Sequence, residues 1–262
     1  MTISTMEWSK AVKKFIYALI PPAFWLGVWQ LAAVLVDRQL NGKGNELLMP
    51  YPATVLTSLV TLLGERAFLL TVFSSLGRIV LGLAIGAATG AVLAGLTCTS
   101  RWADRLLSPA IRVVRATPVA SFILLVVLWT GKNFVPVVIA ALMVVPVVWG
   151  NLSRGIRETD AQLLELARAY RFSRWKTVRL IYLPCLKPYF ASAITTATGL
   201  AWKSGVAAEV LCLPNSAMGT QIFNTKYYLE IPELFAWTAV VVTLSLLLEK
   251  LLRAMLGRKG VE

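Results

Sequence analysis

Six apolar runs divide this chain, and they constrain its fold more than any other feature of the sequence. A transmembrane α-helix needs about 20 mostly apolar residues, because the hydrocarbon core is about 30 Å thick and offers backbone polar groups no partner. We therefore predict an all-α polytopic membrane protein with six transmembrane helices. Tilting, kinks or extension into flanking residues are expected for the short third and fourth runs. The runs cover approximately residues 15–36, 68–96, 119–130, 134–149, 189–211 and 232–252.

The composition also indicates a membrane protein. Hydrophobic residues make up 57% of the 262 residues, against about 45 to 50% in soluble domains. A net charge of +13 could indicate nucleic-acid binding, but the basic residues fill the gaps between apolar runs and form no continuous stripe along the sequence. We therefore expect the lipid bilayer as a partner, and no nucleic acid.

The distribution of basic residues predicts the orientation. With the N-terminus inside, the cytoplasmic gaps hold nineteen Lys and Arg: three in 10–14, four in 101–115, eight in 154–187 and four in 250–259. The outer gaps hold five, namely Arg38, Lys43, Arg66, Lys132 and Lys226. Because basic loops stay in the cytoplasm, we predict a multi-pass protein of the cytoplasmic membrane with both termini inside. Within this count, residues 97–105 are interpreted as a short basic loop, with Arg112 and Arg115 near the same interface.

The segment at residues 160–184 puts a long basic surface into water between the fourth and fifth runs. Asp160 can cap a helix with apolar residues three and four apart, and Ser173 can cap a second one. The second apolar face continues until Pro184 restricts the chain. We therefore predict helix, turn, helix in the cytoplasm. The apolar positions of the first helix are Leu163, Leu164, Leu166, Ala167 and Tyr170.

This segment resembles the cytoplasmic EAA loop of bacterial ABC importer permeases, whose pattern is roughly EAA, then Gly, then Ile and Pro. The residues concerned are Glu165-Leu-Ala-Arg-Ala-Tyr-Arg-Phe-Ser-Arg-Trp and Ile181-Tyr-Leu-Pro184. Glu165, Ala167, Ile181 and Pro184 match, whereas Leu166 replaces the first Ala and Arg171 stands where the family usually has Gly. If the turn needs a positive φ, a non-Gly residue there costs on the order of 1 kcal/mol, which would favour a reshaped turn.

The resemblance extends over roughly residues 47–256 and is greatest to the nitrate, sulfonate and taurine permeases. It implies a type I importer permease of six transmembrane helices, with an N-terminal region at 1–66, a permease core at 67–256 and a cytoplasmic tail at 257–262. The N-terminal region would hold the first span and an outer amphipathic segment, and the core would hold the coupling loop at 158–187. Other similar stretches are Leu48-Met-Pro-Tyr-Pro52, Ser74-Ser-Leu-Gly-Arg78-Ile-Val-Leu-Gly82, Arg115-Ala-Thr-Pro118, Gly199-Leu-Ala-Trp-Lys203 and Ala208-Glu209.

Such permeases are transport subunits without catalytic residues, and this sequence holds no GxxxxGK[ST] phosphate-binding loop. The resemblance implies that ATP and Mg bind to a partner ATPase dimer, and that the chain itself binds no cofactor. It further implies a second permease copy, an extracytoplasmic solute-binding protein, and a small solute, with a sulfonate, nitrate or carboxylate favoured by the basic residues. The segment docking on the ATPase would comprise Leu163, Leu164, Glu165, Leu166, Ala167, Arg168, Ala169, Tyr170 and Arg171.

Three charged residues lie inside predicted spans, at Arg78, Lys203 and Glu209. An isolated charge at the bilayer centre costs about 2.5 to 3.5 kcal/mol, so each should face a partner or water. Two interpretations stay open, a structural ion pair and the lining or gate of the pathway. In the second span, Gly82, Gly86 and Gly90 fall four apart, which predicts close helix packing.

Other functions are weighed against the permease. A self-sufficient secondary transporter or channel could use the three intramembrane charges, but the two halves show no paired broken-helix repeat. A membrane enzyme would need a catalytic constellation that the scattered acidic residues do not supply. The basic segment alone could bind anionic lipid. No metal site is predicted, because the chain lacks His and its cysteines, Cys98, Cys185 and Cys212, lie far apart.

Overall fold

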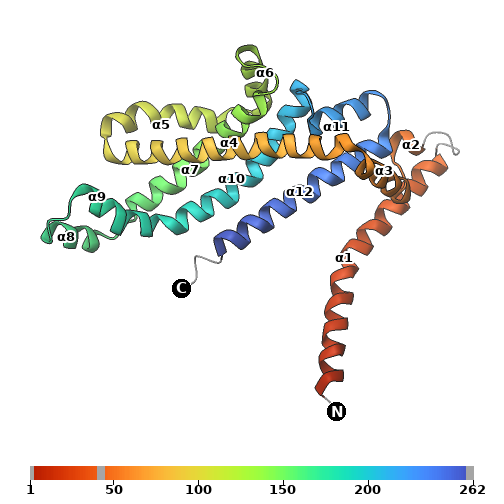
Figure 1. Ribbon diagram of the computed structural model, residues 1–262, viewed down its shortest axis with the longest axis horizontal. Helices are drawn as coiled ribbons and strands as arrows, with labels where there is room; N and C mark the ends of the chain where they lie inside the picture. The colour runs from red at the N-terminus through yellow and green to blue at the C-terminus, as the bar shows by residue number, and fades with distance from the viewer. Residues whose placement is uncertain (1–2, 40–44, 258–262) are drawn as a thin grey trace. The chain divides into compact units, whose positions relative to one another are not determined.

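The computed structural model describes residues 3–39 and 45–257, and within them every regular element is helical. This confirms the predicted all-α class (Figure 1). The chain forms two compact units, Met1–Glu65 with Asn224–Ala239, and Arg66–Phe223 with Val240–Glu262. Because the first unit takes in a late segment, this grouping differs from the predicted division after residue 66, which stays a prediction.

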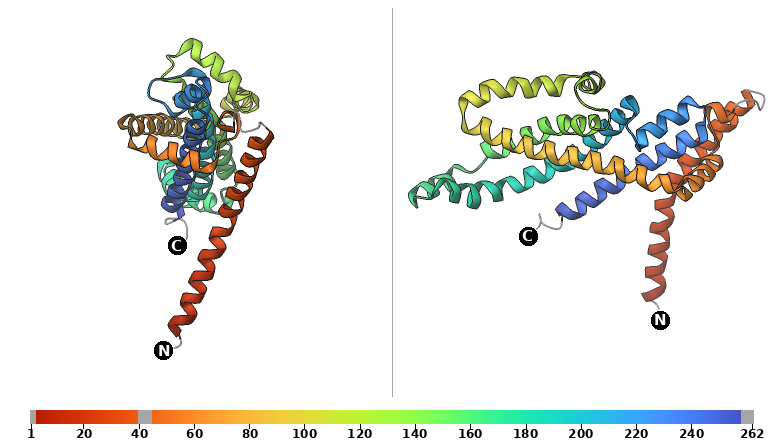
Figure 2. Two further views of the ribbon diagram at one scale, coloured as in Figure 1. Left: turned by 90° about the vertical axis from the view of Figure 1, so that its right-hand side faces the viewer. Right: turned by 45° about the horizontal axis from the view of Figure 1, so that its top comes forward.

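Three long helices form the centre of the larger unit, α4 (Arg66–Thr99), α7 (Val135–Arg157) and α10 (Leu183–Cys212). Gly82 of α4 lies against Val137 and Gly90 against Val145, so α4 and α7 run in the same direction. Contacts of α4 with Gly205 and then, earlier on α4, with Glu209 show that α10 runs in the opposite direction (Figures 1 and 2).

The buried core of this unit includes Ile139, Val144 and Val148 of α7, all with no exposed surface.

The glycine face of α4 is where α7 approaches it most closely. A Cβ placed on Gly82, Gly86 or Gly90 would lie 2.5, 2.6 or 2.9 Å from a carbonyl oxygen of α7, so no side chain fits there without a shift. Small residues allow such an approach, and in lipid the resulting van der Waals contact is a main source of helix association. The packing role predicted for this stripe is confirmed.

The segment after α4 differs from the predicted loop. Ser100 alone separates α4 from α5 (Arg101–Ala116), and its hydroxyl caps α5 by accepting from the Ala103 N–H (3.4 Å). The prediction of a basic loop over 97–105 is therefore wrong, because the charged residues there take one face of an amphipathic helix. The apolar side of α5 packs on α4 and α7, burying Ile111.

The third apolar run forms a helix with nearly the predicted bounds, α6 (Val119–Trp129). Its 11 residues, at 1.5 Å per residue, are only about 16 Å long, too short to cross a membrane alone. The chain bends by 110° at Thr117-Pro118, between α5 and α6, so the two helices make either a broken span or a re-entrant loop. The fourth run does extend into flanking residues as predicted, since α7 has 23 residues.

By length and composition, four helices of the described chain could cross a membrane, or five if α5 and α6 count as one span. The 30-residue α10 is long enough to cross as well, but polar residues reduce its hydropathy. A membrane protein with several spans is thus confirmed, and the number six stays a prediction.

The smaller unit begins with α1 (Ile3–Gln39), which continues through Pro21 and Pro22. Its Trp29 stacks on Phe235 at 5.6 Å between ring centroids, and the indole N–H donates to the Pro50 carbonyl (3.1 Å). The amphipathic segment expected in the N-terminal region forms α3 (Pro52–Gly64), which follows the short α2 (Asn45–Leu48).

The gap between the fifth and sixth apolar runs is partly helical. It holds α11 (Met218–Tyr227), and the last helix follows as α12 (Ile231–Gly257). Polar residues at 215–228 favour a loop in the sequence, but α11 is fixed at its first turn by contacts described below, which a sequence does not reveal.

The close packing of α4 on α7 gives a first prediction. Gly86→Ala should destabilise the detergent-solubilised protein by about 1 to 3 kcal/mol, because the new Cβ would lie 2.6 Å from the Ala141 oxygen and 2.7 Å from Val144 Cβ. Thermal unfolding followed by size-exclusion chromatography measures this as a lower midpoint. Gly77→Ala is the matched control, since nothing lies within 4 Å of its Cβ position. Equal losses in both variants would refute the packing role.

Candidate coupling segment and buried ion pair

The predicted cytoplasmic segment begins with a capped helix. In α8 (Ala161–Ala169), the Asp160 carboxylate accepts from the Gln162 N–H (2.8 Å), which confirms the predicted cap. A carboxylate at this position also interacts favourably with the positive end of the helix dipole. The helix start is therefore fixed by a residue of the segment itself.

The end of α8 is a Schellman motif centred on Arg171. The Phe172 N–H donates to the Ala167 carbonyl (2.8 Å), and the Arg171 N–H donates to the Arg168 carbonyl (3.0 Å). This motif needs a left-handed residue after the cap, usually Gly. Arg171 takes that conformation with φ 51°, so the turn keeps its shape and the expected reshaping does not occur.

The second helix of the segment begins as predicted but does not end at Pro184. Ser173 Oγ accepts from the Lys176 N–H (3.3 Å) to cap α9 (Arg174–Thr177). A π-helical turn, η1 (Val178–Tyr182), then leads directly into α10. Pro184 has no N–H and is the second residue of α10, at the junction where the π-helical turn passes into the α-helix.

The apolar residues that the sequence predicts as one stripe of α8 lie on two different faces of the helix in the structure. Ala167 is 4% exposed and, with Leu164 and Arg168, lines a cavity of about 880 Å³ beside the ends of α4, α7 and α10. The other apolar residues point away from it and are exposed, at 40% for Leu163, 54% for Leu166 and 71% for Tyr170. Only these three form an apolar ridge free for a partner, and we call them the α8 ridge.

The ends of the segment are held close together by α7 and α10. A Cβ on Gly155 would lie 2.7 Å from the Tyr189 ring and 2.8 Å from Leu186, so the helices touch at this point. Just beyond it, the Tyr189 hydroxyl donates to the Glu158 carboxylate (2.6 Å). A displacement of α8 would therefore act on α7 and α10 together.

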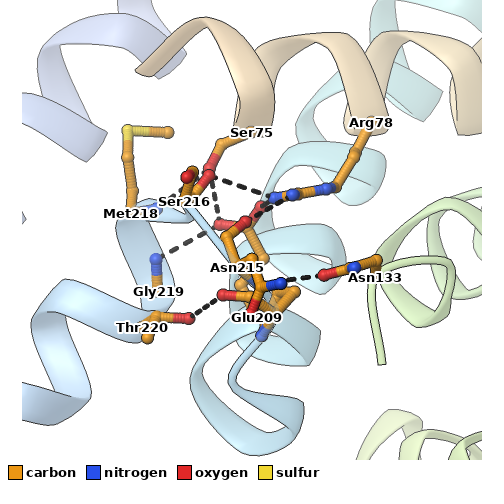
Figure 3. A network of polar contacts seen from close by, with 10 residues as sticks. Ser75, Arg78, Asn133, Glu209, Asn215, Ser216, Met218, Gly219 and Thr220 are labelled. Carbon is orange, nitrogen blue, oxygen red and sulfur yellow. Dashed lines mark hydrogen bonds and ion pairs between the residues drawn. The ribbon is translucent and has the colours of Figure 1, made fainter. Parts of the chain in front are cut away.

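Glu209 is the centre of a second candidate site, inside the larger unit (Figure 3). Its side chain has no exposed surface and forms an ion pair with Arg78 Nη1 at 3.4 Å. The Ser75 hydroxyl donates to the same carboxylate (2.8 Å), and so does the Gly219 N–H (3.2 Å). Every charge and polar atom of this buried group thus has a partner, as a buried ion pair requires.

The same cluster fixes the turn between α10 and α11. Arg78 also donates to the carbonyls of Asn215 (2.5 Å) and Ser216 (3.3 Å), while the Met218 N–H donates to Ser75 Oγ (2.9 Å). The Asn215 N–H reaches the Asn133 side chain before α7 (2.9 Å). The contacts visible in Figure 3 therefore join α4, α10 and α11 to the turn that precedes α7.

Lys203 is not part of this cluster. It lies six residues before Glu209 on α10, on a different face of the helix, and its side chain is exposed. Within residues 3–39 and 45–257, no ion pair includes it. Arg78 and Glu209 thus form a buried ion pair, and Lys203 is separate from both. The sequence did not indicate Asn133, Asn215 or Ser216, whose backbone or amide groups come together only in the fold.

No group of three or more metal-ligating side chains occurs in the part of the chain that the structure describes. The two sites therefore offer an exposed apolar ridge at one end of the helices and a fully paired ionic cluster near the other. Together with several apolar helices, they place the chain in the class of polytopic membrane proteins that carry a structured helical segment at one end of the long helices.

Comparison with known proteins specifies the family. Residues 86–258 match the family model of the binding-protein-dependent transport system inner membrane component. This match covers more than half of the sequence, and the chain belongs to that family. It is a permease subunit of an ABC importer in the cell membrane, as the resemblance of its EAA-like loop predicts.

Relatives of the nitrate, sulfonate and taurine type are similar over most of the chain. The putative aliphatic sulfonates transport permease SsuC of Escherichia coli K12 is 30% identical over 84% of this chain and 82% of its own length. The nitrate import permease NrtB of Synechococcus elongatus is 25% identical, covering 76% and 73%. The taurine transport permease TauC of E. coli K12 is 26% identical, covering 90% and 86%.

Solved structures share the fold at lower identity. A bacterial ABC transporter involved in the import of the acidic polysaccharide alginate gives a TM-score of 0.65 at 17% identity, covering 97% of this chain and all of that one. An amino acid ABC transporter crystallised with histidines gives 0.60 at 19% identity, covering 72% and 94%. These likenesses confirm the importer permease fold.

The left-handed Arg171 gives a prediction for the coupling segment. Arg171→Gly should slow hydrogen exchange of the Phe172 amide about fivefold, because Gly avoids a steric cost on the order of 1 kcal/mol at φ 51°. Amide exchange of the purified protein by mass spectrometry measures this. Arg174→Gly, three residues on and inside α9, should speed exchange or leave it unchanged. Faster exchange in the Arg171 variant would show that the arginine side chain holds the turn.

The buried ion pair between Arg78 and Glu209 gives another prediction. Glu209→Ala should destabilise the solubilised protein by about 3 kcal/mol or more, because Arg78, Ser75 and the Gly219 N–H lose their common acceptor. Lys203→Ala, on an exposed position of the same helix, should change the unfolding midpoint little. The double variant Arg78→Gln with Glu209→Gln should lose less than the two single changes added together. Additive losses would contradict a pairwise interaction.

Proposed function

We propose that the α8 ridge is the surface on which a separate cytoplasmic ATPase subunit docks, and that ATP binding there drives transport by this permease. One observation carries the proposal. Leu163, Leu166 and Tyr170 form an exposed apolar face on a short helix that is capped at both ends and stands outside the long helices. Residues at such spacing suit an amphipathic helix lying in a partner's groove.

The connections of α8 support transmission of force to the long helices. Glu158 and Tyr189 hold the two ends of the segment together, and the Gly155 contact joins α7 to α10. A rigid shift of α8 would then rock both helices, and through the α4–α7 contact it would also move α4. Such rocking changes which side of the membrane a pathway faces.

We propose further that both termini are cytoplasmic and that two copies of the permease enclose the pathway. Seventeen basic residues against five support the orientation, even when Arg112 and Arg115 of α5 are left out of the nineteen in the cytoplasmic gaps. A symmetric pair suits an ATPase dimer with two grooves for two α8 helices. An extracytoplasmic solute-binding protein would deliver the substrate, as the family description implies, and one structural relative was solved with a periplasmic protein.

A small organic or inorganic oxoanion is the proposed substrate. The similar permeases SsuC, NrtB and TauC are named for aliphatic sulfonates, nitrate and taurine, all of which carry a sulfonate or nitrate group. The surplus of basic residues in this chain agrees with an anion. A self-sufficient ion-coupled transporter is not favoured, because the family depends on a binding protein.

The ridge can be tested by truncating it. Leu166→Ala and Tyr170→Ala should each weaken capture of the ATPase subunit about tenfold, since buried apolar anchors carry most interface energy. The measurements are the amount of ATPase that co-purifies with the permease and the uptake of labelled taurine, nitrate and an aliphatic sulfonate into proteoliposomes. Membrane insertion and the unfolding midpoint should be unchanged, because both side chains are exposed.

Leu63→Ala is the matched control, since Leu63 is 56% exposed on α3, which belongs to the smaller unit and not to the segment. Ala167→Leu is a second, contrasting variant: its side chain lines the cavity, so it should lower stability as well as coupling. Wild-type ATPase capture and uptake in both ridge variants would overturn the docking proposal. A purified, transport-competent protein without any ATPase would overturn the coupling mechanism itself.

A further inference from the structure

Four arginines share one face of α5, of which the sequence predicted only the first five residues as part of a loop. Arg101, Arg105, Arg112 and Arg115 lie within about 80° of each other around the helix axis, at 100° per residue. All four side chains are exposed. In the part of the chain that the structure describes, no carboxylate pairs with any of them, although Arg105 lies over the Trp102 ring at 5.9 Å. We call this face the arginine ridge.

The depth of the ridge follows from the neighbouring helices. Trp149 donates its indole N–H to Thr97 Oγ1 (3.0 Å), which brings the polar end of α7 level with the end of α4. Trp149 is also the last residue of its apolar run, and tryptophan is typical of the membrane interface. The edge of the hydrocarbon core is therefore close to Thr97 on α4.

From this edge α5 runs back along α4, as both Figure 1 and Figure 2 show. At 1.5 Å per residue, Arg112 lies about 16 Å and Arg115 about 21 Å along the axis from Arg101, which follows the end of α4 directly. Relative to Thr97 these two arginines are about 13 and 18 Å inside a core of about 30 Å. The ridge thus extends from the interface to near the bilayer centre.

Unpaired guanidinium groups at this depth need water or an anion. Each charge in contact with hydrocarbon would cost about 2.5 to 3.5 kcal/mol, and Arg115 is too deep for its side chain to reach the interface easily. The acidic residue nearest to the ridge on α5, Asp104, pairs with Arg157 (3.9 Å) and accepts from Ser108. The ion pair and hydrogen bonds of Glu209 involve none of the arginines of the ridge.

We propose that the arginine ridge lines the half of the translocation pathway that is continuous with the coupling end, and that it binds a small oxoanion in transit. A planar guanidinium donates two parallel hydrogen bonds to a sulfonate, nitrate or carboxylate, and four in a row offer successive sites. This deepens the proposed function, on which it rests, by assigning residues that select an anion. The ridge takes the role that the sequence suggested for Arg78, which the structure pairs with Glu209.

Cysteine accessibility tests the ridge without knowledge of the substrate. In a background with Cys98, Cys185 and Cys212 changed to Ala, R112C and R115C would be treated in membrane vesicles with anionic and cationic methanethiosulfonates. Both positions should react, and after normalisation to a free thiol the anionic reagent should be faster by about fivefold or more. V113C is the matched control at the same depth: its side chain lies 100° around the helix with the apolar Trp102 and Leu106, and it should react slowly.

If the ridge attracts anions, the faster reaction of the anionic reagent at R112C must come from the arginines that remain in the ridge. Adding Arg105→Gln to R112C should reduce the anionic preference about twofold, since the two positions are about 10 Å apart along the axis. Unreactive thiols at 112 and 115, or equal rates with both reagents, would overturn the ridge. A reaction that appears only when anionic phospholipid is removed would show that the ridge binds headgroups, and would overturn it too. These rates do not depend on ATPase capture, so the ridge and the docking proposal can fail separately.

Discussion

The approach of α4 to α7 along three glycines is the constraint on which the rest of the larger unit depends. In lipid, helices gain little from burying apolar side chains, so association relies on contact between closely fitted surfaces. Gly82, Gly86 and Gly90 bring the backbone of α4 within contact of α7 carbonyls and so fix the relative height of the two helices. The relative height of α4 and α7 therefore sets the depth of the nearby charged residues in the membrane.

Charges in this protein occur in two different environments. Glu209 and Arg78 are enclosed, with each donor and acceptor matched, and they fasten the turn after α10 to α4. The arginines of α5 and Lys203 are exposed and have no carboxylate partner among the described residues. A paired charge in a membrane protein contributes to structure, whereas an unpaired one requires water or a ligand. This difference separates structural from pathway candidates better than their positions in the sequence.

The coupling segment combines a rigid shape with firm attachment. Local hydrogen bonds define α8 at both ends, and Arg171 accepts a strained backbone so that the turn keeps the form usually given by glycine. The helices on either side touch at Gly155 and are joined by Tyr189 and Glu158. Motion imposed on α8 therefore has few ways to be absorbed locally and is passed to α7 and α10.

The sequence by itself determined the membrane class, the helical fold, the family, the glycine packing face, and the capped helices of the coupling segment. Each of these depends on local composition or on spacing within one element, which a sequence displays directly. Only the tertiary structure decided that Glu209 pairs with Arg78 and Ser75, more than 130 residues away, and that Ala167 faces inward while Leu166 faces out. It also placed residues 101–105, predicted as part of a loop, in the helix α5, which packs Ile111 and Ser108 against neighbouring helices. Contacts between distant segments depend on how helices fit together, and the pattern within a single segment does not contain that information.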